Sequence, residues 1–392
     1  MGNLQAWVRV VFFISVAVPT ALYGALEQEV NQQFERYSQK LDETYRNILA
    51  KKPHLQNRLG DRPKQQASFG YGLLPEITTS GRVSLEVLER EKKHSERTYS
   101  WKKTREVLVL DEQRLAVLEN LVQSQPQANV DDQIISAYTT LRENQNYIID
   151  LINYNRVWQK DITLHKDFYD SRNKLLAILR QRDTVLGNSK KYEKLNNEFV
   201  KLVYANTKSP KFLKVVRKKN KVILSIKIYT DINDQKFRQT FKDVIEEYWQ
   251  VTDRNKKYSI LLNLVYVPVE KLYLKEAPPG VSQRINIDNH VARFPKDGGV
   301  LTTGAQSTYG QMGSFVVFGP AKLDASVLAH EFGHLLGLPD VYLRAYKKIS
   351  AEDNEIVEAS PGRRDLMASP GEGYVFSYHF EKIINSVKKK SR

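Results

Sequence analysis

The stretch HEFGHLLGLPD, residues 330–340, indicates more about this chain than any other part of its sequence. Side chains four residues apart lie on one face of a helix, so His330 and His334 can present two imidazole nitrogens to one metal ion, with Glu331 beside them. A zinc ion with three protein ligands keeps a fourth position for water, and it lowers the pKa of that water from about 15.7 toward about 7. Glu331 is then placed to take the proton as the water attacks a carbonyl group.

The third ligand is expected from the turn that follows this helix. Gly337 comes after the last apolar turn, where a left-handed residue commonly ends a helix and where glycine has no steric cost. Pro339 cannot extend a helix, and it fixes the approach to Asp340. We therefore expect the chain to reverse at Gly337 and to carry the Asp340 carboxylate back toward the same ion, which we expect to be Zn²⁺.

The residues before the motif give it the right local context. Residues 314–318 (SFVVF) are typical of a buried strand, which Gly319 and Pro320 end. Asp324 is a candidate N-cap for the next helix. Apolar residues then recur at helical spacing, so one face can enter a core while the histidines face a cleft; they are Val327, Leu328, Phe332, Leu335 and Leu336.

The motif has a glycine three residues, and an aspartate six residues, after its second histidine. It resembles the extended zinc motif of metzincin-type metallopeptidases in its aspartate-ended form, and it is most similar to the immune inhibitor A group, with snapalysin as a more distant relative. DLMAS, residues 365–369, resembles the Met-turn of that clan, in a chain with only 3 methionines. Over about residues 220–385, the resemblance implies zinc ligands, a general base and a methionine floor beneath the metal: His330, His334 and Asp340; Glu331; and Met367.

The sequence departs from this family in one respect, and it does not settle the identity of the third zinc ligand. Many metzincins carry a tyrosine two residues after the Met-turn methionine, but this chain has Ser369 there. Tyr374 and Tyr378 are candidate oxyanion stabilisers, with His379 close by; the alternative is that the tyrosines are core residues with satisfied hydroxyl groups. In the immune inhibitor A group a carboxylate farther along can replace the aspartate, and the candidates here are Glu352, Glu355, Glu358 and Glu372.

The fold class expected for the chain is α+β. A strand at 222–229, a helix at 234–250 and a strand at 258–267 predict a mixed twisted sheet with a backing helix and the active-site helix. The glycine-rich residues 298–313 lack the lysine of a phosphate loop; they are typical of an edge strand with a flexible rim that pairs with substrate, or of a surface loop. Residues 231–234 (DIND) hint at calcium ligands, but a solvated turn is favoured.

The amino-terminal end predicts export. Residues 10–26 carry no charge and follow Arg9, a pattern that orients the amino end inside. A cleaved signal peptide and a retained membrane anchor both fit this run, and a buried helix is disfavoured. The chain has no cysteine, which excludes disulfides and a lipidated cysteine. The expected location is periplasmic, extracellular or membrane-anchored and facing outside.

Four consecutive regions are predicted: 1–26 as signal peptide or anchor, 27–83 as an amphipathic helix and linker, 84–210 as a helical domain, and 211–392 as a zinc metallopeptidase domain. In the second region residues 53–82 contain the prolines and glycines of a linker. Helical periodicity is expected at 84–122, 130–158, 161–186 and 190–204. The helical domain is interpreted either as a propeptide that covers the cleft or as a permanent docking or oligomerising module.

The formal net charge of +15 invites a nucleic-acid interpretation, but Lys and Arg are dispersed among acids and outline no groove. No specific nucleic acid is therefore expected as a partner. The function expected is that of an exported zinc-dependent endopeptidase acting on a protein or peptide substrate. The alternative is a non-catalytic, membrane-tethered helical scaffold with a degenerate peptidase-like domain, and Glu331 argues against it because a structural zinc site needs no such carboxylate.

Overall fold

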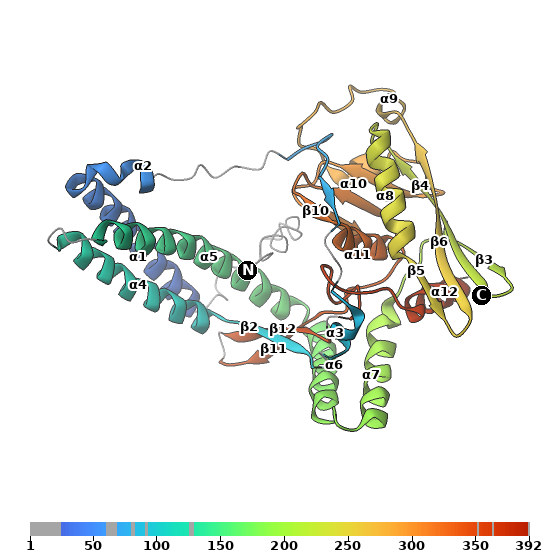
Figure 1. Cartoon of the computed structure of the whole chain (residues 1–392), viewed down its shortest axis with the longest axis horizontal. Coiled ribbons are helices and arrows are strands. Elements are labelled where there is room, and N and C mark those ends of the chain that lie inside the picture. The colour runs from blue at the N-terminus through green and yellow to red at the C-terminus, as the bar shows by residue number, and fades with distance from the viewer. Residues whose placement is uncertain are drawn as a thin grey trace. The chain divides into compact units, whose positions relative to one another are not determined.

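The computed structural model describes residues 25–59, 69–79, 83–90, 93–124, 129–350, 353–362 and 364–390. All but the last two residues of the uncharged run 10–26 lie outside these ranges. Among the described helices, none is both long and apolar enough to cross a bilayer. The described residues form long helices and a mixed β-sheet, which is consistent with the predicted α+β class (Figure 1).

The chain forms two compact units that are not continuous in sequence. The helical unit combines residues 1–65, 97–173 and 344–358, and the sheet unit combines residues 66–96, 174–343 and 359–392. The predicted regions were continuous, with one boundary at residue 210, and the observed units do not follow that boundary. The difference has a physical reason, since each unit includes segments that are distant in sequence and are held by hydrogen bonds between buried side chains.

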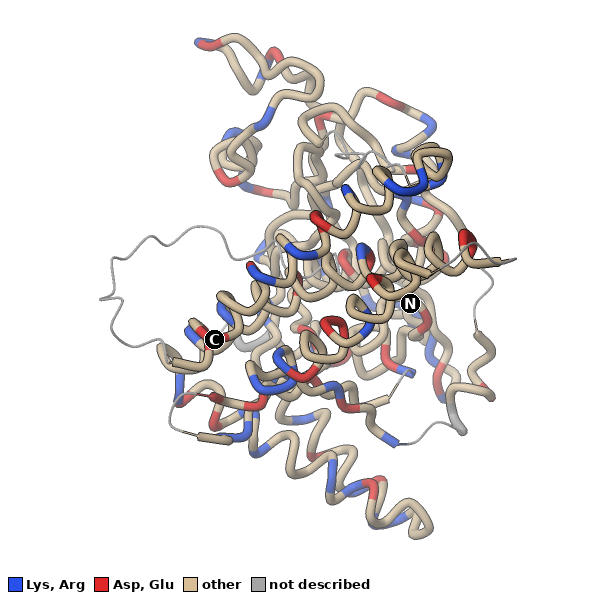
Figure 2. The backbone as a smooth tube through the Cα atoms, turned by 90° about the vertical axis from the view of Figure 1, so that its left-hand side faces the viewer, with Lys and Arg blue, Asp and Glu red and all other residues tan. Residues whose placement is uncertain are grey.

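Three long helices build the helical unit. They are α1 (Ala25–Lys51), α4 (Trp101–Gln123) and α5 (Val130–Leu164), and they enclose a core of apolar side chains from all three. Val30, Tyr37, Leu41 and Ile48 of α1 are buried, so the amphipathic helix predicted at the start of this region is confirmed. Lys and Arg are interspersed with Asp and Glu along the backbone (Figure 2), which is typical of a solvated surface.

The prediction of a linker from residue 53 onward is wrong for residues 53–59. Residues there form a 3₁₀ turn, η2 (Pro53–Leu55), and a short helix, α2 (Gln56–Leu59). Leu55 and Leu59 are buried in the core of the helical unit. Proline is tolerated in the first turn of a helix, so the prolines and glycines of this region did not exclude helical structure.

The helical periodicity expected from residue 84 is interrupted. Only α3 (Leu85–Arg90) is helical there. β2 (Ser95–Tyr99) follows as an edge strand that pairs with β12 (Asn354–Ser360), and β12 in turn pairs with β11 (Leu343–Lys348). Asp353, before β12, accepts hydrogen bonds from the backbone N–H groups of Trp101 and Lys102 at the start of α4, both 3.2 Å long. This carboxylate at the helix amino end satisfies donors that a helix leaves unpaired.

The helices expected at 161–186 and 190–204 are confirmed, although the first is divided. Helix α5 ends at Leu164 and α6 (Lys166–Thr184) follows it, while α7 (Ser189–Val203) leads into a 3₁₀ turn, η3 (Tyr204–Asn206). His165 separates the first two helices with a backbone φ of −124°.

A mixed sheet is the centre of the sheet unit, as predicted. Its strand order is β5-β6-β4-β7-β9-β8, with β3 paired to β4. Strands β4, β6, β7 and β9 are parallel, and β3, β5 and β8 are antiparallel to their neighbours. The strands are β3 (Lys214–Lys218), β4 (Lys221–Thr230), β5 (Gln250–Asp253), β6 (Lys256–Tyr266), β7 (Gly299–Thr303), β8 (Tyr309–Gln311) and β9 (Phe315–Phe318).

The glycine-rich stretch 298–313 was predicted to be an edge strand with a flexible rim or a surface loop, and this is correct for only part of it. Its first strand, β7, lies between β4 and β9, and all five of its residues are buried. Within this stretch, β8 is the strand that lies at an edge of the sheet. Gly298 and Gly299 allow close packing, because a Cβ at Gly298 would approach the Tyr229 ring to 2.9 Å.

Short helices and two-residue strands complete the sheet unit around the helix that carries the motif, α11 (Ala325–Leu335). Its Phe332 contacts the rings of Phe241 in α8 (Gln235–Tyr248) and of Trp249. The remaining elements are β1 (Ile77–Thr78), which pairs in parallel with β10 (Leu323–Asp324), and α9 (Val269–Leu272), α10 (Ile287–Val291) and α12 (Ser377–Lys390).

Candidate metal centre

Helix α11 begins and ends as its sequence predicts. Asp324 is the N-cap residue, and its side chain accepts a 2.8 Å hydrogen bond from the Ser326 N–H. The apolar face of the helix is buried, including Leu328, Phe332 and Leu335. His330 and His334 lie one helical turn apart on the other face of the helix, and their ring centroids are 4.8 Å apart.

The carboxyl end of α11 forms a Schellman turn. Gly337 N–H donates to the His334 carbonyl at 2.8 Å, and Leu338 N–H donates to the Gly333 carbonyl at 3.0 Å. Gly337 has a φ of +94°, and a Cβ there would lie 2.3 Å from the Lys208 carbonyl oxygen. The predicted left-handed turn at Gly337 is therefore confirmed, and it directs Asp340 back toward α11.

Hydrogen bonds fix which nitrogen each histidine presents. His330 Nδ1 lies 2.9 Å from the Leu366 carbonyl oxygen, and His334 Nδ1 lies 2.9 Å from the Leu338 carbonyl oxygen. A carbonyl oxygen only accepts, so each Nδ1 carries the proton. In neutral imidazoles the Nε2 lone pairs then remain available, which is how ligating histidines are commonly oriented.

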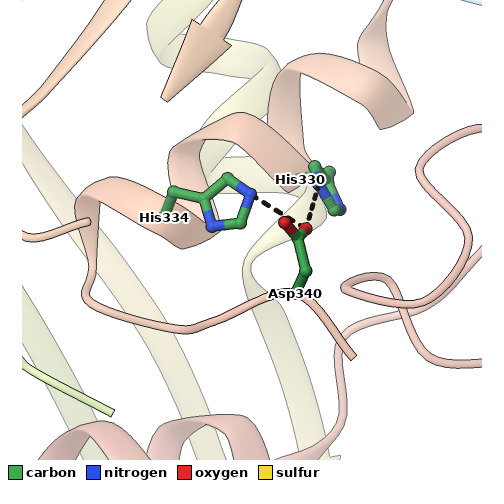
Figure 3. A group of neighbouring side chains, drawn as sticks. All are labelled: His330, His334 and Asp340. Atoms are coloured by element: carbon green, nitrogen blue, oxygen red, sulfur yellow. Dashed lines mark ion pairs between the residues drawn. The ribbon is translucent and has the colours of Figure 1, made fainter. Parts of the chain in front are cut away.

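The three predicted ligand atoms converge on one point (Figure 3). His330 Nε2 and His334 Nε2 lie 3.3 and 3.1 Å from Asp340 Oδ1, and all three atoms lie within 4.8 Å of one another. Bonds of about 2.0 Å to a tetrahedral zinc ion would place neighbouring ligand atoms roughly 3.3 Å apart. The geometry of the cluster therefore fits this ion.

Two of these atoms lack hydrogen-bond partners. His330 Nε2 and Asp340 Oδ1 are buried, and although they lie within ion-pair distance, neither has a hydrogen bond of good geometry to a described residue. Buried polar atoms are nearly always paired, and an unpaired buried group costs free energy. A cation at the point of convergence would satisfy both atoms at once.

The charges of the cluster are strongly coupled when no metal is present. Burial lowers the pKa of His334, but the nearby Asp340 carboxylate more than offsets this and raises it to about 9. Burial raises the pKa of Asp340, but the two histidines outweigh burial and hold it well below its usual range. The carboxylate is therefore ionised and available to a cation.

Glu331 lies next to this cluster and contacts the edge strand. Its Oε2 accepts a 2.6 Å hydrogen bond from the backbone N–H of Gly310 in β8. Burial raises the pKa of Glu331, and the two histidines oppose this increase. A Cβ at Gly310 would lie 2.2 Å from the Glu331 carbonyl oxygen, so only glycine allows β8 to approach α11 this closely. The motif located Glu331, but no pattern in the sequence indicated its partner.

Met367 packs against α11 at Gly333, between the two histidines in sequence. A Cβ at Gly333 would approach the Met367 sulfur to 2.5 Å, so the absence of a side chain at Gly333 makes room for this methionine. The tight turn is closed by hydrogen bonds from the Ala368 and Ser369 N–H groups to the Asp365 carbonyl, each 3.0 Å long. The same turn supplies the Leu366 carbonyl that accepts from His330.

A buried polar network supports this turn. Asp365 Oδ1 accepts from the Met367 N–H at 2.7 Å. The hydroxyls of Tyr204 and Tyr378 donate to Asp365 Oδ2, both at 2.8 Å, and His379 Nε2 lies 3.1 Å from Oδ1. Burial raises the pKa of Asp365, but His379 and the hydroxyl donors outweigh it and the pKa lies below its usual value.

The candidate oxyanion stabilisers have other partners. Tyr378 donates to Asp365, and the Tyr374 hydroxyl donates to the Val83 carbonyl at 2.9 Å. Both hydroxyl groups are therefore satisfied within the fold, as the alternative expects, although both side chains are half-buried and not part of the core. Tyr204 was not among the predicted site residues, because a single tyrosine in a helix-ending turn carries no sequence signal for this contact.

The alternative third ligands do not join the cluster. Glu355 pairs with Lys103 at 2.9 Å, and Glu358 pairs with Arg344 at 2.7 Å, both in the helical unit. Glu372 is half-buried near the Asp365 turn, and Glu352 lies outside the described residues. Among the described residues, Asp340 alone completes the group with the two histidines.

The stretch 231–234 is not a solvated turn throughout. Asp231 is buried and accepts hydrogen bonds from Tyr71, His290 and Thr302 at 2.8, 2.9 and 2.8 Å. Asp234 is the N-cap of α8, with its side chain accepting from Phe237 N–H. Both aspartates therefore have hydrogen-bonding roles within the fold.

Comparison of the chain with family models, with curated proteins and with solved structures returned no match.

Proposed function

We propose that the chain is a zinc-dependent endopeptidase with a metzincin-like catalytic domain in its sheet unit. One observation carries this proposal: His330 Nε2, His334 Nε2 and Asp340 Oδ1 converge at distances that fit a tetrahedral ion, and two of these buried atoms have no hydrogen-bond partner. The order of the ligands, the turn at Gly337 and the packing of Met367 below α11 support the same assignment.

The chemistry would be shared between the ion and Glu331. A zinc ion held by the three side chains would polarise the peptide carbonyl and lower the pKa of an adjacent water toward about 7. Glu331 would accept one proton from the water as its oxygen attacks the carbonyl carbon. The same proton would then pass to the amide nitrogen as the C–N bond breaks.

The surroundings of Glu331 suit this role. The Gly310 N–H holds Oε2, which leaves Oε1 to exchange the proton. Burial raises the pKa of the carboxyl group and so increases its basicity. Beside it, β8 is the edge of the sheet and pairs only with β9 among the described strands. An extended peptide could add to such an edge.

Elemental analysis and hydrolysis assays test this proposal together. The full-length chain, purified without chelator, should contain about one zinc ion and should cleave casein or a peptide library. A strong chelator should remove both the zinc and the activity, and added zinc should restore them. A gently purified, folded chain without transition metal, or undiminished hydrolysis after complete metal removal, would contradict the proposal.

A further inference from the structure

Two tight turns lie side by side at one end of the sheet unit. One joins β3 to β4 and the other joins β5 to β6, and β4 and β6 run in parallel, so both strands begin at the same end (Figure 1). The two turns contact each other through a 2.7 Å hydrogen bond from the Lys257 N–H to the Asn220 carbonyl. Lys219 and Arg254 take left-handed backbone conformations, each with a φ of +44°. Segments that are distant in sequence therefore form one surface.

This surface is densely cationic, and we call it the basic end. Its Lys and Arg side chains are exposed, and none forms a salt bridge with a described residue; they are Lys214, Arg217, Lys218, Lys219, Lys221, Arg254, Lys256 and Lys257. The acidic residue in these strands, Asp253, accepts a 2.6 Å hydrogen bond from the Ser377 hydroxyl. No carboxylate of the same strands therefore pairs with the cations.

The strand register brings like charges together. Lys218 lies opposite Lys221, and Lys221 lies beside Lys257 on the next strand. Neighbouring strands are only about 4.8 Å apart, and like charges in such positions destabilise a sheet. An anionic partner would remove this repulsion.

Apolar side chains lie on the same face as these lysines. Side chains two residues apart share a face, so Val216 lies with Lys218, and Leu261 lies with Lys257. Val216 is 37% exposed and Leu261 is 52% exposed, whereas the opposite face carries buried residues such as Leu224. The outward face therefore presents exposed apolar groups bordered by lysines.

We propose that the basic end and the exposed apolar groups beside it dock on an anionic phospholipid surface. Cations next to a lipid surface are attracted to anionic headgroups, and neighbouring apolar side chains can enter the interface below them. A nucleic acid would gain nothing from Val216 and Leu261, and the exposed side chains of the basic end include no aromatic ring for base stacking. The uncharged run at residues 10–26 is also of a kind that brings a chain to a membrane.

Vesicle binding of the full-length chain tests this inference. The triple variant K218Q/K221Q/K257Q should bind vesicles of 30% phosphatidylglycerol and 70% phosphatidylcholine roughly 100-fold more weakly at low salt, from about fivefold per charge. Pure phosphatidylcholine vesicles should bind both proteins equally. High salt should remove most of the difference.

A charge-matched control distinguishes binding through the basic end from a general effect of the protein's net charge. The variant K40Q/K103Q/K166Q also removes three charges, but each of these lysines has a carboxylate partner, Glu119, Glu355 or Asp170. It should change binding to anionic vesicles by less than about twofold. An equal loss in both triple variants, or no loss in the first, would overturn the inference.

A single apolar substitution separates a lipid surface from a soluble polyanion. Leu261→Ser should weaken binding to anionic vesicles by about threefold, because it removes an apolar group that would enter the interface, and it should leave binding to a short DNA duplex unchanged. If K218Q/K221Q/K257Q lost only duplex binding and kept vesicle binding, the basic end would be a nucleic-acid surface instead.

Discussion

Two of the buried groups of histidine and aspartate in the sheet unit differ in one physical respect. In the first, His290 Nε2 donates to Asp231, its Nδ1 lies 2.8 Å from the Tyr273 hydroxyl, and Thr302 and Tyr71 donate to the remaining sites on the carboxylate. No atom of this group is left unpaired among the described residues. The group is complete as it stands.

The second group, His330, His334 and Asp340, has similar residue types but a different hydrogen-bond pattern. Its Nδ1 atoms are hydrogen-bonded to carbonyl groups, while His330 Nε2 and Asp340 Oδ1 lie within ion-pair distance but have no hydrogen bond of good geometry to a described residue. The comparison teaches that residue type and burial do not separate a histidine with both nitrogens paired from one that could bind a metal ion. The unfilled bonding capacity at the point of convergence does, because a folded protein leaves few buried polar atoms unpaired.

The largest difference between the groups is expected from removing one histidine of each. If the proposed zinc site is correct, His334→Ala should contain no zinc and show no measurable hydrolysis while remaining folded, because one of the three proposed ligands is gone. His290→Ala should keep about one zinc per chain but lose roughly 1–3 kcal/mol of stability, since part of a buried carboxylate is left unpaired. Metal content and denaturant unfolding of both variants measure these effects. Loss of zinc from a folded His290→Ala variant would show that the two groups do not differ in this way.

Glu331→Gln should abolish most of the hydrolysis while leaving metal binding by the second group intact. The amide cannot accept the proton, so hydrolysis should fall by about 10²–10⁴-fold. Zinc content should be unchanged, because Glu331 is not among the converging atoms. Steady-state hydrolysis and elemental analysis on one preparation measure both quantities. A nearly normal rate would exclude Glu331 as the base.

Asp365→Asn tests how far metal binding by the second group depends on the hydrogen bonds that hold the turn at residues 365–369. Asp365 holds the turn whose Leu366 carbonyl orients His330, so the substitution should weaken zinc affinity by about 10–100-fold without removing a ligand. Competition with a chelator of known affinity measures this. Tyr204→Phe removes one donor to the same carboxylate and should have a smaller effect in the same direction. Unchanged zinc affinity in both variants would show that the network supports only the fold.

The smallest effect is expected from Tyr71→Phe in the first group. The substitution removes the hydroxyl that donates to Asp231 and keeps the ring, so unfolding should require roughly 1–2 kcal/mol less free energy. Zinc affinity and turnover should not change. A chemical denaturation curve gives the first value, and a change in zinc affinity greater than about twofold would indicate that the two groups are coupled.

The same contacts bear on the choice between propeptide and permanent module. Tyr71 and Tyr204 both lie within the stretch that a propeptide ending near residue 205 would remove, yet both belong to the sheet unit and donate to its buried carboxylates. Removal of that whole stretch would leave Asp231 and Asp365 short of partners, which is costly in a buried site. These contacts favour a permanent role for the parts of the stretch that carry Tyr71 and Tyr204.

Local sequence predicted what depends on near neighbours. The periodicity of α1, α5 and α8, the cap at Asp324 and the turn at Gly337 all follow from interactions within a few residues, and each is observed. The central position of β7 and the three-stranded sheet with β2 were missed. A short strand is defined by its partners, and those partners are far away in the sequence.

For the site, the motif alone specified the spacing of His330, Glu331 and His334, because one helix fixes all three positions. Only the tertiary structure decided that Asp340 Oδ1 lies with both Nε2 atoms, that Gly310 holds Glu331, and that Tyr204 supports the turn beneath His330. The reason is physical: helical geometry is set by bonds between residues a few positions apart, whereas the pairing of buried polar atoms is set by segments that meet only when the chain folds.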